Sequence, residues 1–154
     1  MPIAAVIQLN GNSDVERNLA TTERLARQAA EQGAVLVATP EATTYLGPHK
    51  RKVALAEPVD GPTNQRLARL AADLGITLLV GSIAERFDEE RAYNTTVVFG
   101  PDGTLQAQYR KMHLFDVDLQ SSGGVTFRES ERTAPGDQLV VTPSPIGTIG
   151  LSIC

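Results

Sequence analysis

The sequence has only one cysteine, Cys154, and it is poor in basic charge. A single cysteine cannot form an internal disulfide and leaves too few thiols for a structural zinc site, which favours a reducing, cytoplasmic location. The 14 Lys and Arg residues are outnumbered by 18 Asp and Glu residues, giving a formal net charge of −4. Nucleic-acid binding requires a basic face that neutralises phosphates. The charge therefore argues against a nucleic-acid partner and favours a small-molecule one.

Long apolar runs and cofactor motifs are also missing. No run of about 18 apolar residues is present to span a bilayer, and Met1 leads directly into a strand-like run without a signal peptide. The sequence contains no P-loop, no Rossmann fingerprint, no HExxH motif and no paired cysteines. We therefore expect no membrane insertion, no metal and no cofactor. With 154 residues, 42% of them hydrophobic, a single domain over 1–154 is expected.

What the sequence does contain is an alternation of predicted strands and helices. The predicted elements are a strand at 3–9, a helix from 15 to 30, a strand at 34–38, a helix at 63–74, a strand at 76–81, and a hairpin of strands at 93–99 and 105–109. The first strand is expected to be buried on both faces because it is almost entirely apolar. Ser13 and Glu16 fit a capping box at the start of the first helix, and Gly33 suits its end. This order predicts an α/β fold with a mixed sheet covered by helices.

Three further segments are harder to assign. We interpret 42–62 as a long surface connection whose basic run, 49–52, is a solvated face rather than a phosphate site. The polar segment 116–138, which includes the Ser-Ser-Gly-Gly run 121–124, is longer than structureless loops usually are, and such loops are often functional. A short strand at 139–142 is followed by a buried strand at 149–153, with Cys154 at its carboxyl end.

Three predicted strands each end at one chemically reactive side chain: Glu41, Lys111 and Cys154. The carboxyl ends of strands are where α/β proteins usually place their ligand sites. Each residue alone also has an ordinary interpretation. A loop glutamate is usually just exposed, and a lone cysteine is most often a small buried hydrophobe.

Taken together, the local sequences around these residues resemble the nitrilase superfamily of carbon–nitrogen hydrolases. The matching stretches are 40–42, 109–116, 127–130, 134–136 and 150–154. Their order and spacing agree as well. The Lys-x-His-Leu-Phe-Asp and Phe-x-Glu-Ser stretches look most like the Nit-type branch, whose members hydrolyse ω-amides of keto-dicarboxylic acids and deaminated glutathione.

The resemblance implies an α-β-β-α sandwich and a Cys-Glu-Lys triad that hydrolyses a small linear amide and releases ammonia. Cys154 would be the nucleophile that forms a thioester, Glu41 the general base and acid, and Lys111 the cation that stabilises the intermediate. Glu129 matches a second glutamate that orients the lysine and the substrate. His113 is expected to be a structural histidine or one that supports the site indirectly, and not the base of a Cys-His pair. The family also implies a homo-oligomer, at least a dimer, for a complete chain.

The resemblance reaches Cys154, which is the last residue, so the chain matches roughly the first half of the family's sequence. We therefore expect apolar strand faces to be left open and the 154-residue chain alone to show little or no turnover. Two other functions stay open. One is a non-catalytic α/β interaction module in which Cys154 is inert, and the other is a nitrile or N-carbamoyl hydrolase that uses the same triad.

Overall fold

A mixed β-sheet forms the centre of the protein, for which a computed structural model describes residues 1–120 and 124–154. Its strands are β1 (Ile3–Val6), β2 (Ala34–Ala38), β3 (Thr77–Arg86), β4 (Ala92–Phe99), β5 (Leu105–Arg110) and β8 (Thr133–Ala134). They are hydrogen-bonded in the order β1-β2-β3-β4-β5, and β8 pairs with β4. The β1, β2 and β3 strands run parallel, whereas β4 is antiparallel to both of its neighbours, β3 and β5. The predicted mixed α/β fold and its hairpin are confirmed.

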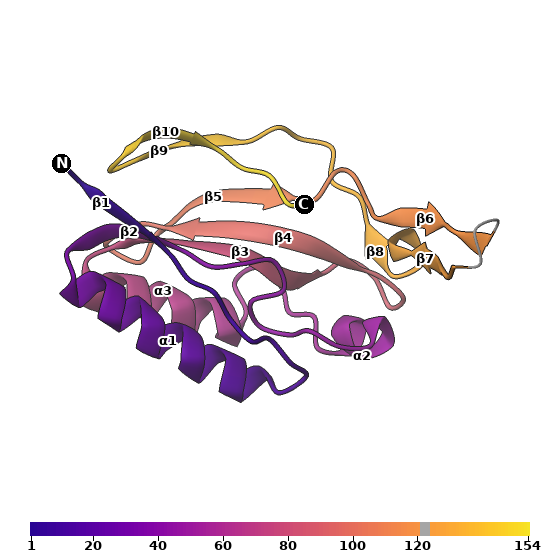
Figure 1. The fold of residues 1–154 in the computed structure, drawn as a ribbon. Coiled ribbons are helices and arrows are strands. Elements are labelled where there is room, and N and C mark those ends of the chain that lie inside the picture. The colour runs from indigo at the N-terminus through magenta and orange to yellow at the C-terminus, as the bar shows by residue number, and fades with distance from the viewer. Residues whose placement is uncertain (121–123) are drawn as a thin grey trace.

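Two long helices, α1 (Val15–Glu31) and α3 (Pro62–Leu74), cover one face of this sheet (Figure 1). Both helices bury one stripe of apolar side chains at helical spacing, as their sequences predict. The largest core cluster joins these stripes to β2, β3 and β4 through Leu19, Ala26, Val37, Leu67, Leu70, Leu78, Val80 and Val97. A fully buried leucine contributes about 1.5–3 kcal/mol relative to an exposed one. This layer therefore supplies the rigid base on which the strand ends are held.

The start of α1 differs from the sequence-based expectation. The N-cap is Asp14, whose carboxylate accepts a hydrogen bond of 3.0 Å from the backbone N–H of Arg17. The predicted capping box of Ser13 and Glu16 is therefore wrong. Asp14 lies one residue closer to the first helical residue and also has a good capping side chain, so it takes the position. Gly33 follows the helix with a φ of +87°, as its predicted role at the helix end requires.

The first strand is shorter and more exposed than predicted. β1 ends at Val6 instead of residue 9, and the residues Ile3 and Val6 are 50% and 88% exposed. The prediction that this strand is buried on both faces is therefore wrong. Among the described residues, β1 pairs only with β2 and forms an edge of the sheet, which an apolar run cannot reveal by itself.

On the other side of the sheet lies a two-stranded hairpin of β9 (Val141–Ser144) and β10 (Gly147–Gly150) (Figure 1). The strand predicted at 139–142 is thus displaced to β9. β10 ends at Gly150, so the strand predicted at 149–153 is also wrong in its extent. Leu151 and Ile153 are nevertheless buried, against Val98 and Tyr109 of the sheet. This packing directs the last residues along β5.

The polar segment after β5 is partly ordered. The short strands β6 (Asp116–Asp118) and β7 (Thr126–Arg128) form an antiparallel pair, and the 3₁₀ helix η2 (Glu129–Glu131) follows. Residues 121–123 of the predicted Ser-Ser-Gly-Gly run lie outside the described residues. Between Pro48 and β3, the only helix besides α3 in this stretch is the short α2 (His49–Ala54). The predicted long connection therefore contains one short helix.

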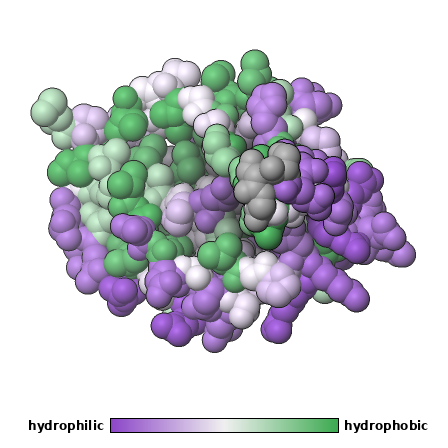
Figure 2. All heavy atoms as spheres, turned by 45° about the vertical axis from the view of Figure 1, so that its right-hand side comes forward, coloured by the Kyte–Doolittle hydropathy of each residue, from purple (hydrophilic) through white to green (hydrophobic). Residues whose placement is uncertain are grey.

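The surface is divided in character. Hydrophilic side chains gather on the side that carries β6 and β7, whereas apolar side chains are frequent on the opposite side of the view in Figure 2. The exposed large apolar residues include Val6 of β1, Leu139, and Val141 of β9. The expectation that apolar strand positions are left open is confirmed for Val6 and Val141. Within the described ranges, no helix has the length and apolar character needed to cross a membrane.

Candidate functional site

The turn that carries Glu41 is fixed by β3. After β2 ends at Ala38, the backbone N–H of Ser82 donates to the carbonyl of Pro40, and that of Thr43 donates to the carbonyl of Ser82, both at 2.9 Å. Ala42 has a φ of +57°, a left-handed conformation that costs a non-glycine residue about 1–2 kcal/mol. Its N–H donates to Ser82 Oγ at 3.1 Å, which helps to hold this conformation. The turn therefore presents Glu41 in a defined direction.

Lys111 follows β5 directly and is anchored by its own backbone. Its N–H donates to the carbonyl of Asn94 at 2.8 Å, and its carbonyl accepts from the N–H of Gly136 at 2.9 Å. The residue is only 2% exposed. A buried lysine requires a counter-charge, because an unpaired ion in the interior is strongly disfavoured.

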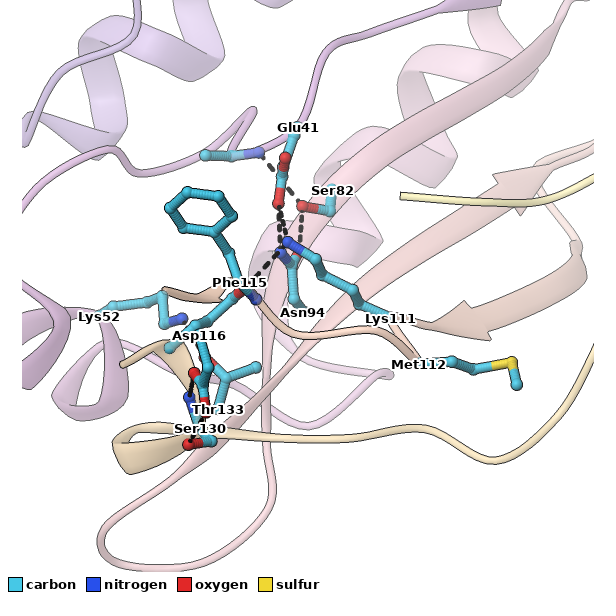
Figure 3. A network of polar contacts seen from close by, with 12 residues as sticks. Glu41, Lys52, Ser82, Asn94, Lys111, Met112, Phe115, Asp116, Ser130 and Thr133 are labelled. Carbon is cyan, nitrogen blue, oxygen red and sulfur yellow. Dashed lines mark hydrogen bonds and ion pairs between the residues drawn. The ribbon is translucent and has the colours of Figure 1, made fainter. Parts of the chain in front are cut away.

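Two glutamates provide that counter-charge (Figure 3). Lys111 Nζ donates to Glu41 Oε1 at 3.1 Å and to Glu129 Oε2 at 2.9 Å. Glu129 comes from η2, is 9% exposed, and also accepts a hydrogen bond of 2.8 Å from the backbone N–H of Phe115. The structure thus brings together three of the four residues proposed from the sequence.

The same contacts keep both buried partners charged. Burial by itself disfavours the charged form of Lys111, but its hydrogen bonds to Glu129 and Glu41 outweigh burial and raise the pKa of the ammonium group. Burial likewise disfavours ionised Glu129, but the Phe115 N–H and Lys111 outweigh it and lower the pKa of that carboxyl group. Lys111 and Glu129 therefore form an ion pair at neutral pH.

Two polar residues that the sequence analysis did not identify complete the network. Asn94 of β4 donates its side-chain N–H to Glu41 Oε1 at 2.7 Å. The Oδ1 atom of Asn94 accepts a hydrogen bond from Ser82 Oγ, and Ser82 in turn contacts the turn that holds Glu41. The only sequence signal was that a serine and an asparagine interrupt two strands that are otherwise largely apolar or β-branched.

A pocket of about 230 Å³ opens beside Glu41. The residues that line it are Glu41, Ala42, Thr44, Tyr45, Leu46, Gly47, His49, Lys52, Ser82, Ile83, Ala84, Asn94 and Glu129. Lys52 was not expected here. The basic run 49–52 was interpreted as a solvated face, which holds for Lys50 and Arg51 but not for Lys52, because Lys52 is half-buried and donates to Thr133 Oγ1 at 2.8 Å.

The fourth proposed residue, Cys154, is exposed. Its neighbour Ile153 packs in the same cluster as Tyr109, two residues before Lys111, so the terminal segment approaches the end of β5. No hydrogen bond joins Cys154 to Glu41 or Lys111 in the part of the chain that the structure describes. His113 is exposed and lies outside the network. The described residues include no cluster of three or more His, Cys, Asp or Glu side chains suited to a metal ion.

The site can be compared with known proteins. Residues 3–154 match the model of the family described as carbon-nitrogen hydrolase. The omega-amidase NIT2 of Homo sapiens is 41% identical over 152 residues, which are 97% of this chain and 53% of that protein. The omega-amidase NIT2 of Danio rerio is 40% identical with the same coverage. The chain therefore spans about half the length of these relatives.

Solved structures agree with this relationship. The NitFhit protein of C. elegans superposes with a TM-score of 0.88 at 30% identity, over 98% of this chain and 37% of that one. An amidase from Nesterenkonia sp. AN1, which carries an acrylamide adduct at its active site cysteine, superposes with a TM-score of 0.82 at 25% identity. That match covers 98% of this chain and 56% of the amidase. The predicted nitrilase-like fold is confirmed.

Proposed function

Because the chain belongs to the carbon–nitrogen hydrolase family, we propose that it carries the catalytic residues of an amidase that acts on small linear amides. The observation on which this rests is the hydrogen-bonded set of Glu41, Lys111 and Glu129, in which Glu41 and Glu129 line a pocket. In this proposal Cys154 is the nucleophile and forms a thioester with the acyl group of the substrate.

Glu41 is suited to act as the general base. Both of its hydrogen bonds from Lys111 and Asn94 go to the same oxygen, Oε1. Within the described part of the chain, Oε2 has no hydrogen-bond donor, and the side chain is 40% exposed toward the pocket. One oxygen is therefore held in place while the other is free to accept a proton.

Lys111 is suited to stabilise the tetrahedral intermediate. An ammonium group has three N–H donors, and the two glutamates occupy two of them. The third is available to the oxyanion that forms on the substrate. Donors that are already positioned before the reaction stabilise such charge strongly, and the loss of one oxyanion donor typically costs about 10²–10³ in kcat. Glu129 acts by fixing the lysine in this position.

The proposed reaction proceeds in two halves. Glu41 accepts the thiol proton of Cys154 as Sγ attacks the amide carbon, and the resulting intermediate collapses when the proton passes to the nitrogen and ammonia leaves. Water then attacks the thioester while Glu41 accepts its proton, and this proton returns to Sγ as the carboxylic acid is released. The net reaction is amide plus water to acid plus ammonia, and no oxidant or cofactor is required.

For the substrate, we propose an ω-amide of a dicarboxylic acid, of the keto-acid or deaminated glutathione type. The support is the similarity to omega-amidases NIT2, which extends over 97% of this chain. A cytoplasmic location is proposed because a single cysteine suits a reducing compartment, and the resemblance to the family suggests a homo-oligomer of at least two chains when the protein is complete. Light scattering of the purified protein tests the oligomeric state.

The test is ammonia release by the protein isolated from its native source. Succinamate, the corresponding nitrile and an N-carbamoyl amino acid are offered in parallel to the wild type and to Cys154→Ala. We expect release from succinamate that the substitution abolishes. Turnover of only the nitrile or only the carbamoyl compound would show that the protein is a nitrile hydrolase or an N-carbamoyl hydrolase instead of an amidase. Release that survives in Cys154→Ala would contradict the assigned nucleophile, and no release from any compound would favour a non-catalytic module.

A further inference from the structure

Lys52 is the only half-buried residue of the basic run 49–52, although the exposed His49 also lines the pocket. It lies on α2 (His49–Ala54) together with Lys50 and Arg51, which are exposed. Lys52 is instead half-buried, and its side chain lines the pocket beside Glu41. In the view of Figure 3, Lys52 and Glu41 come from different elements, and the ring of Phe115 is drawn between them.

This ammonium group has no anionic partner of its own. Its hydrogen bond of 2.8 Å goes to Thr133 Oγ1, a neutral hydroxyl. No carboxylate oxygen lies within ion-pair distance of Lys52 among the described residues, whereas Lys111 in the same site has two. Burial is the main cause that lowers the pKa of Lys52, and the charge of Lys111 adds to it, although Glu129 and Glu41 act in the opposite direction.

The other charged groups at or beside the pocket leave Lys52 as the ammonium group without a counter-charge. Glu129 is neutralised by its ion pair with Lys111 at 2.9 Å. Lys111 is paired with Glu41 and Glu129, and its remaining N–H is assigned to the oxyanion in the proposed reaction. Glu41 is the group that takes the proton in the proposed reaction. A ligand in the pocket therefore meets a base in one part of the wall and an unpaired ammonium group in another.

We propose that Lys52 binds a carboxylate on the substrate, at the end remote from the amide that is cleaved. The inference rests on the proposed amidase function and adds to it the residue that selects acidic amides over neutral ones. A substrate carboxylate would give Lys52 the counter-charge that the protein does not provide. Hydrogen bonds between charged groups are the strong ones in proteins, especially in a partly desolvated pocket. Lys52 is thus a specificity residue, distinct from the residues that perform the reaction.

The experiment compares two amides with the same carbon chain: succinamate, which ends in a carboxylate, and butanamide, which ends in a methyl group. Ammonia release is measured for the full protein as its native source makes it and for two variants of that protein, Lys52→Met and Lys50→Met. We expect Lys52→Met to lower kcat/KM for succinamate by about 10- to 100-fold and to change that for butanamide by less than about threefold. Lys50→Met is the matched control on the same helix and should change neither value.

A second variant, Lys52→Arg, keeps the charge and should retain the preference for succinamate, which also covers the case in which Lys52→Met does not fold. An equal loss on both amides, or no loss on either, would overturn the proposal. If the wild type hydrolyses neither amide, the proposed amidase function is wrong. Equilibrium binding of the two amides then tests whether Lys52 binds a carboxylate. Succinamate that binds more tightly than butanamide to wild type but not to Lys52→Met supports the subsite, and equal binding refutes it.

Discussion

Replacement of Glu129 by alanine tests the central ion pair of the site most sharply. The substitution removes the acceptor of the 2.9 Å hydrogen bond from Lys111 and of the 2.8 Å hydrogen bond from the Phe115 N–H. Lys111 is then left with Glu41 alone, whose side chain is 40% exposed. Loss of one partner of a buried ion pair typically costs about 3–5 kcal/mol. Because Glu41 remains, we expect the lower end, about 3 kcal/mol.

The assay is urea unfolding followed by far-UV circular dichroism, since the sequence has no tryptophan. With an m-value of about 2 kcal/mol per M, a loss of 3 kcal/mol lowers the midpoint by about 1.5 M. Glu131→Ala is the matched control, because Glu131 lies in the same 3₁₀ helix but is exposed, and its effect should stay within about 0.5 kcal/mol. Equal midpoints for the Glu129 and Glu131 variants would refute the assigned role of the ion pair.

Three further predictions concern the supports of the site. The stability that arises from ionised Glu129 should be fully present above pH 4.5, the ordinary pKa of this carboxyl group, and should fall as the pH drops through the lowered native pKa. The free energy of unfolding of Glu129→Gln should therefore decrease less steeply with acidification than that of the wild type. A Cβ on Gly136 would lie 2.3 Å from the carbonyl oxygen of Arg110, so Gly136→Ala should cost about 1–3 kcal/mol in urea unfolding; an unchanged midpoint contradicts this close packing. Asp14→Ala should lower the free energy of unfolding by about 1 kcal/mol, and Ser13→Ala should leave it almost unchanged. The reverse order would show that Ser13 and not Asp14 caps the helix.

The general fold could be predicted from the sequence because periodicity and turn residues are local signals. The helices α1 and α3 and the hairpin of β4 and β5 were recognised in this way. The burial of β1 could not be predicted. Apolar residues make a strand, but whether it is central or lies at an edge depends on which strands pair with it. The helix cap was also missed, because Ser13 and Asp14 both fit and only the backbone decides between them.

The candidate site was only partly visible in the sequence. Glu41, Lys111 and Glu129 were found through the resemblance, and the structure joins them in one network. Ser82 and Asn94 were missed because their contact depends on the pairing of β3 with β4, whose register shifts between Val80 and Ile83. Such irregularities redirect side chains and carry no simple sequence signal.

Lys52 was missed for a different reason. A run of four basic residues usually marks a solvated surface, and Lys50 and Arg51 follow that pattern, whereas His49 lines the pocket. α2 lies against β3, and from there Lys52 reaches Thr133 of β8, which accepts its hydrogen bond. This is a contact between residues 81 positions apart, and no local pattern reports it.

The most direct test of the proposed function is detection of the thioester itself. The protein from its native source is mixed with succinamate, quenched in acid during turnover, digested and examined by mass spectrometry. The proposal predicts a succinyl group on the peptide that contains Cys154 of the wild type. The amount of this modified peptide should be lower in Lys111→Ala, and the modification should be absent when excess succinate, the product, replaces the amide. An unmodified Cys154 peptide while ammonia is being released would contradict the account.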